Sequence, residues 1–117
     1  MTSQVYKAEL KNNKILDDCC SLLNDQKAGD TVCLDITAFN TYFDYFIITT
    51  GSSKIHCRSL AKYVREFFMK LGYKERSKPD LSSSWIILDF DEFIVHIFTQ
   101  ETREYYQLEK LWAVIRP

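Results

Sequence analysis

The residues from Trp85 to Phe98 constrain the fold of this chain more than any other part of the sequence. They form two runs of aromatic and β-branched residues, separated by the acidic pair Asp91-Glu92. Such residues favour strands, and two strands joined across a two-residue break are typical of a β-hairpin. Because successive side chains of a strand point to opposite faces, both faces of this hairpin are largely apolar. We therefore predict a hairpin in the centre of a sheet, covered on both sides.

Two polar side chains, Asp89 and His96, interrupt this apolar hairpin. A buried polar group without a hydrogen-bond partner is costly, so we expect each of them to have one. For His96 a structural, hydrogen-bonded role is favoured over a catalytic one.

The first part of the chain predicts a helix, two strands and a second helix. Apolar residues at helical spacing predict an amphipathic helix over about 4–24, with a break near Asn12-Asn13. Thr31–Thr37 alternates as a half-buried strand does, and Phe43–Thr50 is apolar enough for the middle of a sheet. A Gly-Ser turn then leads into a helix that ends near Leu71. Its expected buried stripe is Ile55, Leu60, Val64, Phe67, Phe68 and Leu71.

The remaining segments add a short edge strand over Tyr73–Lys78 and a helix over Thr99–Trp112, with Tyr105, Leu108 and Trp112 along one stripe. With 117 residues, the chain is long enough for one hydrophobic core and too short for two. We predict a single α+β domain over 1–117, with its core at about 29–112. A strand, a tight turn, a helix and later strands indicate a crossover. The expected sheet is mixed, has four or five strands, and is packed with helices.

Composition limits the classes of partner. The net charge is −1 with acids and bases interleaved, which argues against a protein that coats nucleic-acid phosphates and against sequence-specific nucleic-acid binding. No apolar run approaches the length of a membrane span. The four cysteines have neither CxxC nor zinc-like spacing, so we expect free thiols and a cytoplasmic protein without a metal or another cofactor.

The turn Gly51-Ser52-Ser53 is the one candidate phosphate-binding turn, because it follows a strand and opens a helix. It lacks the lysine of a Walker loop and the glycines of a dinucleotide loop, so an ordinary serine cap is the favoured interpretation. The alternative is a nucleotide-binding enzyme of nucleotidyltransferase type that combines this turn with Asp44 or Asp89. Such an enzyme needs a metal-binding acid pair soon after the turn, whereas Asp89 and Asp91 lie far downstream. We therefore predict no catalytic residue.

Five segments together resemble the ribosomal silencing factor (Iojap-related) family. The resemblance spans roughly Asp17 to Trp112, with the segments in the family's order and at nearly its spacing. The segments are Leu34–Ile36, Asp44–Ser53, Trp85–Asp89, Val95–Phe98 and Glu101–Trp112.

The resemblance implies a nucleotidyltransferase-like topology without the catalytic acids, and a non-enzymatic function. It implies a factor that binds the large ribosomal subunit through ribosomal protein fourteen, blocks joining of the small subunit and so represses translation. It also implies a homodimer when the protein is free. The sequence departs from the family pattern in two loops, at Asp80-Leu81 and at Asp91-Glu92.

Interface chemistry and the resemblance together suggest which residues contact the partner. Aromatic residues and arginine are the usual anchors of protein interfaces. Trp85 is the expected hydrophobic anchor, and Asp89 and Glu101 are expected to accept hydrogen bonds from basic residues. The remaining candidates are Arg103 and Tyr106, for polar contacts, and His96, for support of the sheet face.

Overall fold

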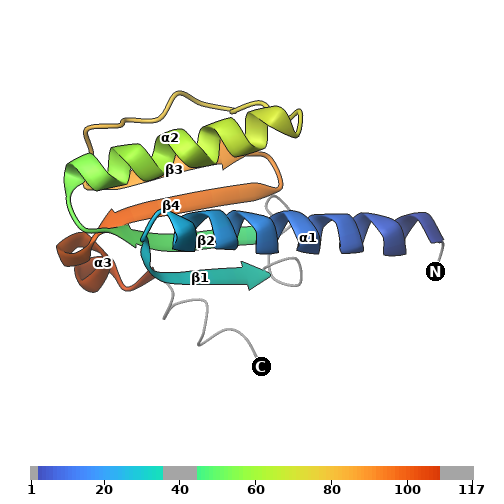
Figure 1. The fold of residues 1–117 in the computed structure, drawn as a ribbon, viewed down its shortest axis with the longest axis horizontal. Coiled ribbons are helices and arrows are strands. Elements are labelled where there is room, and N and C mark those ends of the chain that lie inside the picture. The colour runs from blue at the N-terminus through green and yellow to red at the C-terminus, as the bar shows by residue number, and fades with distance from the viewer. Residues whose placement is uncertain (1–2, 36–44, 109–117) are drawn as a thin grey trace.

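The computed structural model describes residues 3–35 and 45–108, with side chains from residue 14 onward. In this part of the chain, a mixed sheet is packed with helices (Figure 1). The elements in chain order are α1 (Ser3–Asp25), β1 (Gly29–Asp35), β2 (Tyr45–Gly51), α2 (Lys54–Lys70), β3 (Trp85–Phe90), β4 (Phe93–Thr99) and α3 (Gln100–Tyr106). The predicted α+β class and mixed sheet are confirmed.

The sheet has the strand order β1-β2-β4-β3. β2 and β4 are parallel, whereas β1 pairs with β2, and β3 with β4, in antiparallel fashion. The predicted hairpin is therefore the β3–β4 pair, and Asp91 at its bend has a positive φ of 69°. Only half of the hairpin is central, because β3 is an edge strand and its Ile87 is 44% exposed.

The predicted edge strand over Tyr73–Lys78 is wrong, because this segment forms no strand. One backbone hydrogen bond, from the Arg76 N–H to the Asp89 carbonyl at 2.9 Å, ties it to β3. Arg76 also pairs with Asp91 across 3.4 Å. A single bond fixes the loop against the edge without extending the sheet.

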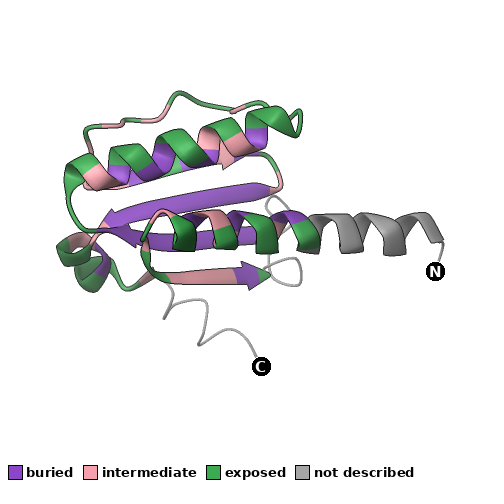
Figure 2. Ribbon diagram, in the orientation of Figure 1, coloured by how far each residue is buried: buried purple, intermediate pink, exposed green. Residues whose placement is uncertain are grey.

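One face of the sheet is covered by α1 and α2, and the main core lies between these layers (Figures 1 and 2). The buried side of α2 consists of Cys57, Leu60, Ala61, Val64 and Phe68. Ile55 and Leu71 were expected in this stripe but are 71% and 47% exposed. Ile55 precedes Cys57 by two residues, which is roughly 200° around a helix and turns it toward solvent.

The opposite face of the sheet is apolar too, as the sequence predicts. Its buried residues are Leu34, Phe46, Ile48, Ile94 and Phe98. Trp85 and Leu108 are partly buried and pack against them. Both faces of β2 and β4 are thus apolar, which explains why these strands read as nearly continuous hydrophobic runs.

Both terminal helices differ from their predicted lengths. α1 is continuous through Asn12-Asn13, so the predicted break is wrong. α3 ends at Tyr106, because Gln107 adopts a left-handed conformation with φ of 50°. Tyr105, which shares a predicted stripe with Leu108 and Trp112, is 77% exposed, and Trp112 lies outside the described residues. None of the helices in the described part of the chain is both long and apolar enough to cross a membrane.

A disulfide joins Cys20 of α1 to Cys33 of β1, so the expectation of four free thiols is wrong. The chain turns tightly after α1 and brings β1 back against that helix, which places two cysteines 13 positions apart next to each other. No local spacing rule predicts such a pair. Cys19 and Cys57 are free and buried, and burial raises the pKa of Cys19 to about 12.

We expect reduction of this disulfide to lower the free energy of unfolding by about 3 kcal/mol, since it closes a short loop in the unfolded chain. Urea unfolding of the wild type with and without dithiothreitol measures this change, and Cys20→Ser should match the reduced wild type. A Cys19→Ala variant should keep its sensitivity to the reductant. If dithiothreitol does not shift the unfolding midpoint, the bond contributes no stability.

Candidate functional site

Four aromatic side chains gather where β3 begins, β4 ends and α3 follows. We call Trp85, His96, Phe98 and Tyr106 the Trp85 cluster. The centroid of the Trp85 ring lies 4.9 Å from that of Phe98 and 4.8 Å from that of Tyr106. The cluster forms because Trp85 pairs with Phe98 across the hairpin and α3 continues directly from β4. Trp85 is half-buried and Tyr106 is exposed.

His96, a buried residue of β4, fixes the orientation of the Trp85 side chain through a hydrogen bond. The Trp85 Nε1–H donates to His96 Nδ1 at 3.0 Å. Indole can only donate, so Nδ1 is the acceptor and the proton of the neutral imidazole is on Nε2. Nε2 is buried and has no hydrogen-bond partner among the described residues. The expectation that His96 is hydrogen-bonded is thus confirmed for one of its two nitrogens.

Burial lowers the pKa of His96 from 6.5 to about 4. The ring is therefore neutral at pH 7, which is the form that can accept the hydrogen bond from Trp85. Protonation would place a charge among the rings of Phe46, Phe98 and Trp85.

The shift makes stability depend on pH. In the unfolded chain His96 takes up a proton near pH 6.5, whereas in the folded chain it does so only near pH 4. We therefore expect stability to be complete above pH 6.5 and to fall by about 3 kcal/mol between pH 6.5 and 4. Denaturant unfolding at several pH values measures this fall. His96→Gln keeps an acceptor for Trp85 but should no longer show this fall in stability, whereas His56→Gln should still show it. Equal pH profiles for the wild type and both variants would contradict the assignment of the fall to His96.

The outward side of α3 continues the Trp85 cluster. Glu101, Tyr105 and Tyr106 are exposed, and with Ser84 and Thr102 they line a shallow hollow of about 360 Å³. Glu101 is therefore exposed, as the predicted contact with a basic partner requires. The hollow contains a carboxylate, two phenols and two hydroxyls, which suit hydrogen bonding to a partner surface.

Arg103 points the other way and is 7% exposed, so the expected surface contact does not fit its position. Its Nη1 donates to Thr50 Oγ1 at 2.8 Å and reaches the Gly29 carbonyl at 3.4 Å. Arg103 and Tyr105 are two residues apart, so they lie on opposite sides of the helix. Anchoring of Arg103 inside the protein therefore leaves Tyr105 facing solvent.

Asp89 does not join the Trp85 cluster. It lies four residues further along β3, roughly 13 Å away at the usual rise of a strand. Its Oδ1 accepts a hydrogen bond from the Asp91 N–H at 3.1 Å, at the hairpin bend. Between Trp85 and Asp89, on the same face, lies the exposed Ile87, which the sequence analysis did not select. Alternation along the strand places Ile87 on the same face as Trp85. It does not show that β3 is an edge strand, and that edge position leaves Ile87 exposed.

The turn Gly51-Ser52-Ser53 is occupied by the protein itself. Ser53 Oγ accepts from the His56 N–H at 3.1 Å, which confirms the predicted serine cap. His56 Nδ1 accepts from the Ser52 N–H at 2.8 Å, and its Nε2 lies 2.9 Å from the Gln26 carbonyl. The Ser52 N–H, which a bound phosphate would need as a donor, already donates to His56. The turn therefore has a structural role.

No group of three acidic, histidine or cysteine side chains that could hold a metal occurs in the described residues. Asp89 and Asp91 are both engaged at the hairpin bend, as described above. Asp44 lies outside the described residues. The described structure therefore gives the nucleotidyltransferase alternative no acid pair beside the Gly-Ser turn.

Gly51 is required by close approach to α2. A Cβ atom at this position would lie 2.6 Å from Cys57 Sγ and 2.9 Å from the Cys57 backbone nitrogen. We expect Gly51→Ala to lower the free energy of unfolding by about 1–3 kcal/mol through overpacking. Gly29→Ala is the matched control, since its nearest neighbour would be 3.8 Å away. Thermal unfolding compares the two, and equal melting temperatures would contradict this account.

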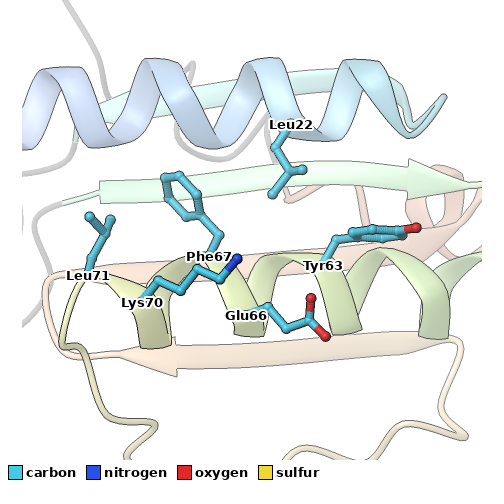
Figure 3. A pocket seen from close by; sticks show the side chains of 6 residues that line it. All are labelled: Leu22, Tyr63, Glu66, Phe67, Lys70 and Leu71. Carbon is cyan, nitrogen blue, oxygen red and sulfur yellow. The ribbon is translucent and has the colours of Figure 1, made fainter.

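A second hollow, of about 270 Å³, lies between α1 and α2, on the face away from Trp85 (Figure 3). Leu22 reaches down from α1 toward Tyr63 and Phe67 of α2, while Glu66 and Lys70 extend along the rim (Figure 3). Its lining is mainly apolar, which suits packing rather than catalysis. The sequence analysis did not identify it.

Comparison with known proteins decides the family. The family model described as "Ribosomal silencing factor during starvation" matches residues 9–116. The chain belongs to this family. The resemblance stated from the sequence is thereby confirmed over almost the whole chain.

Relatives span bacteria and organelles. The chain is 27% identical to the ribosomal silencing factor RsfS of Bacillus subtilis, over 89% of both proteins. It is 34% identical to RsfS of Haemophilus influenzae, over 78% of this chain and 90% of that protein. It is 32% identical to mouse mitochondrial assembly of ribosomal large subunit protein 1, over 85% of this chain and 45% of that protein. The chain thus spans under half of the mouse relative.

Solved structures show the same fold. A crystal structure of a Chromobacterium violaceum protein superposes with a TM-score of 0.78 at 26% identity, covering 86% of this chain and 85% of that one. A Bacillus halodurans structure gives 0.73 at 25% identity, covering 86% and 94%.

Proposed function

We propose that this protein binds the large ribosomal subunit through ribosomal protein fourteen, prevents joining of the small subunit and so represses translation. The observation that carries the proposal is the Trp85 cluster of a chain that belongs to the ribosomal silencing factor family. Blocking by occupancy requires a stable docking surface and no catalytic group. We further propose, from the family resemblance, that the free protein is a homodimer.

The Trp85 cluster has the features of an interface anchor. Binding energy in interfaces is concentrated in a few aromatic or arginine residues surrounded by polar contacts. Trp85 is large, half-buried and held by its hydrogen bond to His96, so little side-chain freedom remains to be lost on binding. Exposed Tyr105, Tyr106 and Glu101 surround it with polar groups. Ile87 extends the apolar part along the edge of β3.

The nucleotide-binding alternative is not favoured. The hydrogen bond from the Ser52 N–H to His56 uses a donor that a phosphate would require. Calorimetric titration with nucleoside triphosphates and Mg²⁺ discriminates between the two hypotheses. Heat of binding at micromolar ligand would restore the enzyme hypothesis, whereas no heat at millimolar ligand would remove it.

The direct test of the docking proposal is sedimentation of the protein with purified ribosomal subunits in sucrose gradients. We expect the protein to migrate with the large subunit alone, and added protein to reduce the fraction of joined ribosomes. Migration with the small subunit, or no comigration with either, would overturn the proposal.

We expect Trp85→Ala to weaken binding to the large subunit by at least about 2 kcal/mol, which is roughly thirtyfold in the dissociation constant. Tyr63→Ala is the matched control, because Tyr63 is a partly exposed aromatic residue of α2 on the other face of the sheet. Binding is measured by fluorescence anisotropy of the labelled protein, and circular dichroism checks that both variants are folded. A folded Trp85→Ala variant with unchanged affinity would show that the ring is not an anchor.

A further inference from the structure

The outward side of α2 carries a regular row of positive charge. Lys54, Arg58 and Lys62 recur every four residues, and all three are exposed. Successive members lie about 6 Å apart along the helix axis. We call these three residues the basic stripe. In a chain whose net charge is −1, the stripe is a local concentration that the overall charge conceals.

The stripe is not neutralised by the protein. None of its three side chains forms an ion pair with a residue in the described part of the chain, whereas Lys14, Arg65 and Arg76 each pair with an acid. Asp80 lies close enough to feel Lys54: hydrogen bonds from Ser82 lower the pKa of its carboxyl, and Lys54 lowers it further to a smaller degree. Glu66 follows Lys62 by four residues on the same side of α2, so the excess of positive charge lies toward the start of the helix.

Helix stability does not explain the stripe. The first turn of α2 contains no acid and begins with Lys54. Positive charge near the start of a helix is unfavourable, because it opposes the helix dipole. The helix dipole therefore gives no stabilising reason for a row of bases that begins in this place.

The stripe begins at the same end of the sheet as the Trp85 cluster. Gly51 pairs with Thr99, so α2 starts beside the end of β4 and the beginning of α3. β3 also begins at this end (Figure 1). A single large partner that touches Trp85 and α3 can therefore reach the start of the stripe too.

We propose that the basic stripe binds the sugar–phosphate backbone of ribosomal RNA, without reading its sequence, while the Trp85 cluster contacts protein. A row of evenly spaced cations fits a chain of repeating phosphates, and contacts of this kind fix orientation without sequence information. This inference rests on the proposed function for the identity of the partner. It is compatible with the absence of an overall basic excess, because three contacts add to a protein interface and do not replace it.

The test is the salt dependence of binding to purified large ribosomal subunits. Each phosphate contact contributes about 0.7–0.9 to the slope of log K against log salt concentration. We expect the triple variant Lys54→Gln, Arg58→Gln, Lys62→Gln to have a slope smaller than the wild type by about 2–3. Between 50 and 200 mM salt the stripe would thus account for about 20- to 40-fold of the loss in affinity.

A matched triple variant separates the stripe from general charge. Lys70→Gln, Lys74→Gln, Lys78→Gln also removes three positive charges from exposed positions. We expect this control to retain the slope of the wild type. Both variants should keep the wild-type circular dichroism spectrum, and removal of Lys54 should leave the melting temperature equal or slightly higher.

A second arm uses protein-free large-subunit RNA in place of the subunit. We expect the wild type and the control to bind it weakly, and the stripe variant to bind at least tenfold more weakly than the control. If the subunit is bound but the stripe variant keeps the wild-type slope, the inference is overturned and the docking proposal stands. If the subunit is not bound, the docking proposal fails, and equal RNA binding by the two triple variants overturns the inference as well. Displacement from the subunit by poly-glutamate as readily as by RNA would assign the stripe to an acidic protein instead.

Discussion

The parallel pairing of β2 with β4 is the interaction on which the rest of the structure depends. It runs from Tyr45 opposite Phe93 to Gly51 opposite Thr99, and both strands are buried along nearly their whole length. Parallel strands end at the same edge of a sheet, so the elements that follow them, α2 and α3, both begin there. The hairpin partner of β4 also starts at this edge. The Trp85 cluster, the hollow beside α3 and the start of the basic stripe are neighbours for this reason.

Two buried polar side chains, Arg103 and His96, determine which side chains at this edge of the sheet face solvent. Arg103 hydrogen-bonds to Thr50 and the Gly29 carbonyl, which ties α3 to the β1–β2 side of the sheet. That anchor leaves Tyr105 and Tyr106 outside. His96 accepts the indole N–H of Trp85 and has a low pKa because it is buried. Its neutral form both avoids a buried charge and supplies the acceptor, so the surface ring depends on the protonation state of a core residue.

The described structure offers exposed surfaces that a partner can contact. The Gly-Ser turn is closed by His56, Asp89 and Asp91 stabilise the hairpin bend, and none of the described acid, histidine and cysteine side chains gather into a metal site. The charged groups are instead distributed over separate faces: Glu101 and Glu104 on α3, and the basic stripe on α2. A net charge near zero is therefore the sum of surfaces that carry opposite charges. It is a poor guide to what each surface binds.

The sequence by itself determined the fold class, the hairpin, the central strand, the serine cap before α2 and the family resemblance. These follow from local rules: side-chain alternation, apolar runs, turn residues and caps depend on neighbours in the chain. The tertiary structure decided the features that depend on contacts between residues far apart in the sequence. Arg103 became internal and Tyr105 external because Thr50, 53 positions away, supplies an acceptor. Cys20 met Cys33 because β1 folds back on α1. Ile87 became exposed because β3 is an edge strand of the described sheet, and strand order is not encoded in the alternation of one segment.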